Sequence, residues 1–167
     1  TNDAKSVGMG LNYILNDNIE ISYGNYYGKD VSTLGDNVWR LHNNALLKWT
    51  PTDQFYAVGI VDWTLQEDPD SEDNVWATFY TLITSYELAK SWEINGRYEY
   101  VTDNDEILIN GAGIGFGQSI VSLSLNYNPI DNATIRIEPK WYGGPSTYSF
   151  SSETAFVLQG GLAIRIE

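Results

Sequence analysis

Few residues in this chain are of the types that carry out catalysis. It has one histidine, His42, and no cysteine, so thiol chemistry and zinc sites with two histidine ligands are excluded. A Ser-His-acid hydrolase needs a serine and a carboxylate held beside the imidazole, and no spacing around His42 fixes either partner. His42 instead alternates with Arg40 and Asn44, which is typical of the polar face of a strand. We therefore expect no enzymatic activity, no catalytic residue and no cofactor.

Residues 111–117 form a glycine-rich segment, GAGIGFG, that resembles a nucleotide-binding loop. The phosphate-binding fingerprint G-x-G-x-x-G must lie between a parallel strand and a helix, but here position 116 is Phe and no helix follows. We expect a flexible, apolar part of a long loop instead, one that could fold into a pore mouth and constrict it.

Acidic side chains cluster in residues 68–73 and 103–106. Such oxygens can bind Ca²⁺ or Mg²⁺, but neither cluster has the EF-hand register, so we expect a solvated acidic rim and no dedicated metal site. Divalent cations could bridge this rim to lipid phosphates. The net charge of −13 argues against nucleic acid as a partner, because its binding needs a basic surface.

The elements that must position these residues are strands, and residues 118–142 show the pattern best. Val121, Leu123 and Leu125 alternate with serine and asparagine, and after a turn at 129–132, Ile135 and Ile137 alternate with charged residues. Successive strand side chains point to opposite faces, so each strand has one apolar and one polar face. The unit is an antiparallel hairpin that the chain repeats.

Nine strands are predicted in this way, in a single domain over residues 1–167. Short turns (16–18, 51–54, 89–91 and 129–132) alternate with longer, acidic connections (28–37, 67–74, 102–118 and 143–153). Short turns on one rim and long loops on the other are typical of an all-β, antiparallel, up-and-down transmembrane barrel, here of about 8–10 strands. A closed antiparallel barrel needs an even number, so either an N-terminal strand is missing or residues 106–117 contain one. We favour the missing N-terminal strand, because the alternation of short and long connections is kept only if residues 102–118 are a single connection.

All six tryptophans lie near predicted strand ends, as two aromatic girdles at the membrane interfaces would require. The predicted girdle residues are Trp39, Trp49, Trp63, Trp76, Trp92 and Trp141. A soluble barrel or sandwich with its apolar face turned inward has the same period of two. The position of the tryptophans, and charges of both signs on the opposite face, favour the membrane barrel.

Short recurring segments resemble the OmpL-like β-barrel porin family of Gram-negative outer membranes. They are residues 46–54 (LLKWTPTDQ), 85–92 (SYELAKSW), 96–100 (GRYEY) and 125–132 (LNYNPIDN). This resemblance implies an outer-membrane porin, of which the chain is a C-terminal portion or a reduced member. It also implies that residues 159–166 match the outer-membrane insertion signal, with Glu167 departing from the aromatic residue that commonly ends such barrels.

The polar face supplies the candidates for a pore lining. They are Glu20, Arg40, His42, Lys48, Asp62, Glu93, Arg97, Glu99, Arg136, Glu138, Lys140 and Arg165. We predict a porin or channel for passive diffusion of small hydrophilic solutes or ions, embedded in the lipid bilayer of the bacterial outer membrane. The alternative is a non-conducting structural or surface-binding barrel whose side chains fill its interior, as they do in small barrels.

Overall fold

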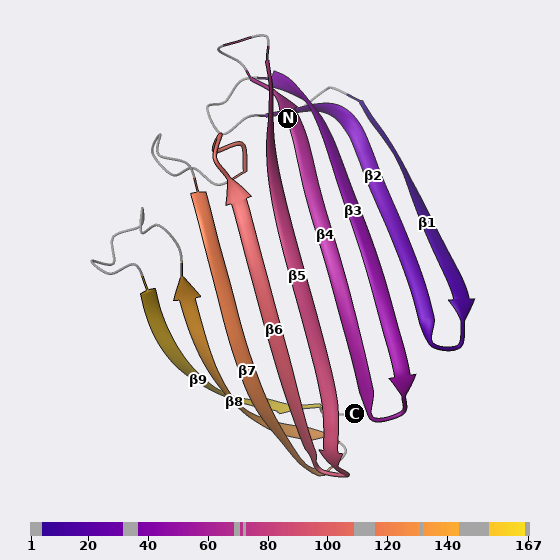
Figure 1. Cartoon of the computed structure of the whole chain (residues 1–167), viewed down its shortest axis with the longest axis vertical. Coiled ribbons are helices and arrows are strands. Elements are labelled where there is room, and N and C mark those ends of the chain that lie inside the picture. Colours follow the sequence, from indigo (N-terminus) through magenta and orange to yellow (C-terminus); the bar gives the residue numbers. More distant parts are fainter. Residues whose placement is uncertain are drawn as a thin grey trace.

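The chain forms one continuous antiparallel sheet of nine strands in simple up-and-down order (Figure 1). The computed structural model describes residues 5–31, 37–68, 71, 73–108, 116–130, 132–143 and 154–165. The strands are β1 (Ser6–Asn16), β2 (Ile19–Val31), β3 (Asn37–Thr52), β4 (Phe55–Glu67), β5 (Asn74–Ala89), β6 (Trp92–Asp103), β7 (Phe116–Ile130), β8 (Ala133–Gly143) and β9 (Thr154–Ile164). This confirms the predicted all-β, up-and-down architecture. No helix in the described part of the chain is long and apolar enough to cross a membrane.

The distribution of buried side chains is the reverse of that in a water-soluble protein. Among the described residues, the buried apolar side chains are Val38, Ala77 and Ile107, whereas large apolar side chains of every strand are exposed. Small polar side chains such as Ser122, Ser124 and Asn126 are buried instead. Side chains converge on the concave face of a curved sheet and diverge on its convex face. The polar face is therefore the concave one, and the apolar face points outward.

The strand register assigns every strand to these two faces. Directly paired residues share a face, so the row formed by Ile21, Leu47, Gly59, Leu82 and Tyr98 points outward. The sequence pattern left the faces of residues 75–88 unassigned, and this row assigns them. Even-numbered residues of β5 point outward and odd-numbered ones inward.

Each of the four short turns consists of two residues between paired strand ends, and the pairing register shifts beside each of them. The backbone carbonyl of the last residue in each turn accepts a 2.8 Å hydrogen bond from the strand after the hairpin. The donors are the amides of Thr50, Glu87, Asn128 and Arg165, and the acceptors are the carbonyls of Asn18, Gln54, Ser91 and Asn132. The short-turn rim is thereby tied together from one hairpin to the next.

The expected loop from residue 28 was wrong, because β2 continues to Val31. Gly28 pairs with Arg40, and a Cβ at position 28 would collide with Ser6 of β1. This glycine therefore permits close packing of two strands and does not begin a turn. Two side-chain contacts stabilise residues 28–31 as part of β2. The Asp30 carboxylate forms an ion pair with Arg40, and the Tyr27 ring stacks on the Trp39 ring with their centroids 5.0 Å apart.

β1 and β9 form the two edges of the sheet, and they do not pair with each other in the described part of the chain. In an alternating antiparallel order the first and ninth strands run in the same direction. Antiparallel closure therefore needs another strand between them, and the further strand expected on the N-terminal side stays a prediction. Of the predicted insertion signal, residues 159–164 lie in β9, while residues 166 and 167 fall outside the described residues.

Candidate functional site

Eleven of the twelve predicted pore-lining residues lie on the concave polar face, and the twelfth, Arg165, follows the last residue of β9. Glu20 pairs with Lys48, Arg40 with Gln66, and His42 with Thr64, so these side chains share one face of β2–β4. The same alternation places seven others inward: Asp62, Glu93, Arg97, Glu99, Arg136, Glu138 and Lys140. Their common face is a finding of the structure, and their role in lining a pore stays a prediction.

Arg40 is the centre of a network at the long-loop end of this face, which we call the mouth cluster (Asp30, Arg40, Gln66 and Ile107). Its Nη1 donates to Asp30 Oδ2 at 2.7 Å, and its Nε donates to Gln66 Oε1 at 3.0 Å. Nη2 donates to the same Gln66 oxygen and, at 3.4 Å, to the backbone carbonyl of Ile107. Arg40 is only 8% exposed, so a buried cation is held by directed hydrogen bonds on three sides.

The Ile107 carbonyl reaches Arg40 because residues 103–108 fold inward after β6. The fully buried Asp103 carboxylate accepts hydrogen bonds from the amides of Ile107 at 2.9 Å and Leu108 at 3.0 Å. Glu106, which precedes Ile107, has a φ of 54°, in the left-handed region that non-glycine residues rarely occupy. Residues 103–108 therefore form a built turn, the inward turn, that extends from β6 over the ends of β5 and β4.

The inward turn corrects one expectation and leaves another untested. Residues 103–106 were expected to form a solvated acidic rim, which is wrong for Asp103, because its carboxylate satisfies backbone amides inside the fold. Residues 111–117 were expected to form a flexible loop that could constrict a pore mouth; of these, 111–115 lie outside the described residues, and 116 and 117 begin β7. The sequence contained one sign of the inward turn, which is Asp103, because an aspartate before a turn often accepts hydrogen bonds from backbone amides a few residues further along the chain.

His42 belongs to a second part of the polar wall. Its Nδ1 lies 2.8 Å from Thr64 Oγ1, and its Nε2 lies 3.7 Å from Asp62 Oδ1, which also accepts from Asn44 at 2.6 Å. The hydroxyl beside the imidazole belongs to a threonine that is fully buried, so a substrate cannot reach it. The arrangement orders side chains along the wall and does not present a nucleophile.

A third network, the floor cluster (Glu93, Asn95, Asn126 and Arg136), lies toward the short turns. Glu93 Oε1 accepts from Asn95 at 2.7 Å and from Asn126 at 2.9 Å, and Asn126 Oδ1 accepts from Arg136 Nε at 2.8 Å. These contacts join side chains of β6, β7 and β8, which are neighbouring strands. The hydrogen bonds of the floor cluster therefore run along the concave face, from each strand to the next.

Ion pairs in the described residues also follow the wall. Arg97 pairs with Glu99 and Lys140 with Glu138, each within one strand, at 2.6 and 3.6 Å. Arg40 and His42 find their carboxylates on adjacent strands. These four ion pairs do not extend across the interior, whereas the hydrogen bond from Arg40 to the Ile107 carbonyl links β3 to a turn that follows β6.

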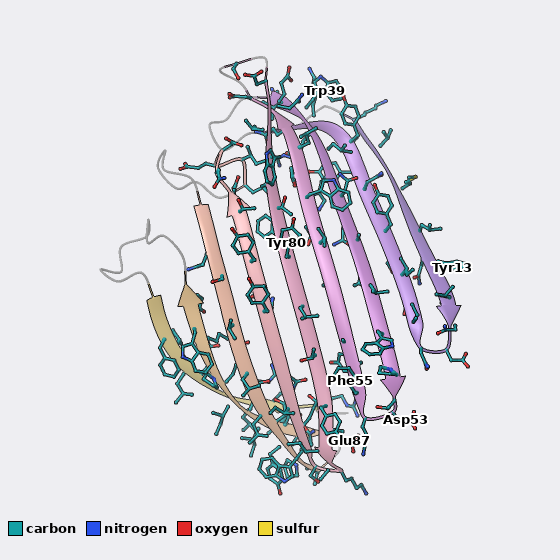
Figure 2. The ribbon with its side chains drawn as sticks, viewed as in Figure 1. Tyr13, Trp39, Asp53, Phe55, Tyr80 and Glu87 are labelled. Atoms are coloured by element: carbon teal, nitrogen blue, oxygen red, sulfur yellow. The ribbon has the colours of Figure 1, made fainter. Side chains whose placement is uncertain are left out.

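The six tryptophans are exposed on the outward face near the two ends of the sheet. Trp39, Trp63, Trp76 and Trp141 lie toward the long loops, while Trp49 and Trp92 lie toward the short turns, where they contact Phe55 and Tyr127. Figure 2 shows Trp39 and Phe55 at these opposite ends. Aromatic rings at both ends of an apolar face fit the predicted girdles.

The acidic segment 68–73 is described only at residues 68, 71 and 73. The Asp68 amide donates to the Asp73 carbonyl at 3.0 Å, and Ser71 donates to the Asp68 carboxylate at 2.7 Å. Among the described residues, no group of three or more histidine, cysteine, aspartate or glutamate side chains is placed to hold a metal ion.

Comparisons with known proteins agree with this geometry. The family model described as "Putative beta-barrel porin-2, OmpL-like" matches residues 1–164. A solved structure of the NanC porin is similar to the chain with a TM-score of 0.61 and 13% sequence identity, covering 98% of this chain and 79% of that one. At this identity the similarity shows the fold. No curated protein matches the sequence.

Proposed function

The chain belongs to the OmpL-like β-barrel porin family and is a porin of the bacterial outer membrane, and on this premise we propose that its concave polar wall passes small hydrophilic solutes and ions by passive diffusion. Membership of this family shows that the chain lies in the outer membrane, with lipid around its convex face, and that it functions as a channel. We further propose that the permeating solutes are small and hydrophilic, that they move along the concave wall, and that the channel weakly prefers cations.

The observation that carries the proposal is the way in which charges pair along the concave wall. If the charged side chains filled the interior, carboxylates and cations would meet across it, between strands far apart in the sheet. The ion pairs of Arg40, His42, Arg97 and Lys140 lie instead within one strand or between neighbouring strands. Polar groups that are satisfied along the wall leave the path beside them to water and solutes.

The balance of charge suggests a weak preference for cations. Of the twelve predicted wall residues, six are lysine or arginine and five are aspartate or glutamate, so the wall itself is nearly neutral. The chain as a whole has a net charge of −13, and the excess of carboxylates lies largely in the long loops. Acidic loops around a mouth concentrate cations there, and salt screens the effect within about 10 Å at 0.1 M.

The test is ion conductance through planar bilayers by the detergent-extracted full chain. We expect discrete channels whose reversal potential in a salt gradient shows a mild cation preference that weakens at high salt. Replacing Asp68, Asp70 and Asp73 with Asn and Glu72 with Gln should reduce this preference. Absence of conductance by folded protein would favour the surface-binding alternative, and an unchanged reversal potential in the fourfold variant would assign selectivity to the wall.

A further inference from the structure

The convex face has a hollow near the middle of β4. Two neighbouring rows of outward residues, Ile21–Leu47–Gly59–Leu82–Tyr98 and Ala45–Val61–Tyr80, are bulky except at Gly59 and Ala45. The result is a groove of about 480 Å³ lined chiefly by Ile21, Leu47, Val61, Tyr80, Leu82 and Tyr98. A Cβ built on Gly59 would meet no atom within 4 Å, so the groove is open at its floor.

We propose that this membrane-face groove binds one acyl chain of a membrane lipid. In an outer-membrane porin the convex face lies against lipid, so water does not reach the middle of β4. Water also has nothing to bind in a groove lined by aliphatic and aromatic carbon. An empty groove would deprive its walls of dispersion contacts, which an acyl chain restores along its length.

A polar group at one end of the groove gives the bound chain a direction. The next row toward the long loops pairs Asn43 with Trp63, and Asn43 is 4% exposed although it points outward. Its Oδ1 accepts from the Tyr23 hydroxyl at 2.7 Å, while its Nδ2 has no hydrogen-bond partner among the described residues. Lipids carry a carbonyl acceptor at the head of each acyl chain, so the chain lies with its carbonyl toward Asn43 and its tail toward Gly59.

The Tyr23 and Trp63 rings flank Asn43, with their centroids 6.3 Å apart. Since Asn43 is almost fully buried, a carbonyl oxygen reaches its Nδ2 only after a neighbouring side chain rotates. A buried donor without an acceptor is costly in a low-dielectric environment, which favours this rearrangement. The groove is also lined by the exposed Tyr80 and Tyr98, and its volume of about 480 Å³ suits one acyl chain, whereas a stable interface with a second copy needs a contact area above about 1,000 Å².

The test uses a phosphatidylethanolamine with a photoreactive diazirine in the middle of one acyl chain. The porin is placed in vesicles of phosphatidylethanolamine and phosphatidylglycerol, irradiated, and the labelled residues are mapped by mass spectrometry. We expect β4 and β5 residues of the groove to be labelled several-fold more than Val121 and Leu123, which are comparably exposed on the same face. A diazirine next to the carbonyl should move the label toward Asn43 and Trp63.

The matched variants are Gly59→Leu and Gly160→Leu. Both glycines point outward and have open space where a Cβ would be placed, so both variants should fold. Gly59→Leu should lower groove labelling several-fold, and Gly160→Leu should leave it unchanged. Uniform labelling of the convex face, or unchanged labelling in Gly59→Leu, would overturn the proposal, as would cross-links between copies through a cysteine at position 59. Conductance is measured in parallel, so that a failure of the channel function is seen separately.

Discussion

The two faces of the sheet bury different kinds of side chain, and neighbouring residues of β7 make the comparison directly. Ser122 on the concave face is 5% exposed, whereas the larger and more apolar Leu123 on the convex face is 46% exposed. In water this arrangement would be unfavourable, because leucine gains more from burial than serine does. It is favourable when the solvent of the convex face is lipid. Exposure measured against water therefore identifies the membrane face.

The concave face itself contains two regions with different tasks. The mouth cluster holds a buried arginine and connects β3 to the inward turn beyond β6. The floor cluster joins side chains of the neighbouring strands β6, β7 and β8. Similar residue types thus bind a folded loop at the long-loop end and bind side chains of neighbouring strands at the short-turn end. The difference comes from the partner, which is a backbone carbonyl of a folded loop at the mouth and side chains at the floor.

The largest effect should come from placing the same charge on the two faces of β5. Leu82→Arg puts a guanidinium into lipid near the middle of the strand, at a cost of about 2–4 kcal/mol, whereas Thr81→Arg leaves it in the aqueous interior. We expect Leu82→Arg to give much less folded, protease-resistant protein in lipid vesicles than Thr81→Arg. Equal yields from the two variants would show that the faces are assigned the wrong way round.

An intermediate effect is expected at the mouth cluster. Arg40→Leu removes the hydrogen bonds to Asp30, Gln66 and the Ile107 carbonyl, each worth about 1.5–3 kcal/mol when one partner is charged. The inward turn should loosen, which should raise single-channel conductance and its noise and lower the temperature of unfolding. Arg40→Lys serves as the control and should retain part of the contact. If conductance is unchanged in Arg40→Leu while the protein loses stability, the turn lies outside the conduction path.

The smallest effect is expected at the floor cluster. Glu93→Gln keeps an oxygen that can accept from Asn95 and Asn126, so the wall should stay intact and conductance should hardly change. Loss of one negative charge should shift the reversal potential slightly toward anions, by less than the fourfold loop variant does. Arg136→Gln is the matched opposite and should shift it toward cations. Two shifts of the same sign would mean that these side chains do not face the permeating ions.

The strand pattern was predictable because alternation is a local property. Each residue of β7 or β8 is assigned to a face by its neighbours two positions away, and the same rule placed eleven of the twelve predicted wall residues on the face where the structure has them. The four short turns were predictable for a similar reason, since asparagine, aspartate, proline and serine favour turn conformations within a few residues. The family resemblance added the outer membrane and the porin function.

The inward turn and the groove depend on residues far apart in the sequence. Asp103 and Glu106 resemble any acidic loop until Arg40, more than sixty residues earlier, is seen to bind the Ile107 carbonyl. Gly59 looks like a strand interruption until the register places it between Leu47 and Leu82. The sequence by itself determined which residues face lipid and which face water in the strands that alternate clearly, but β5, apolar on both faces, was assigned only by its register with β4 and β6. Only the tertiary structure decided which of them meet, because register and loop path are fixed by pairing between strands distant along the chain.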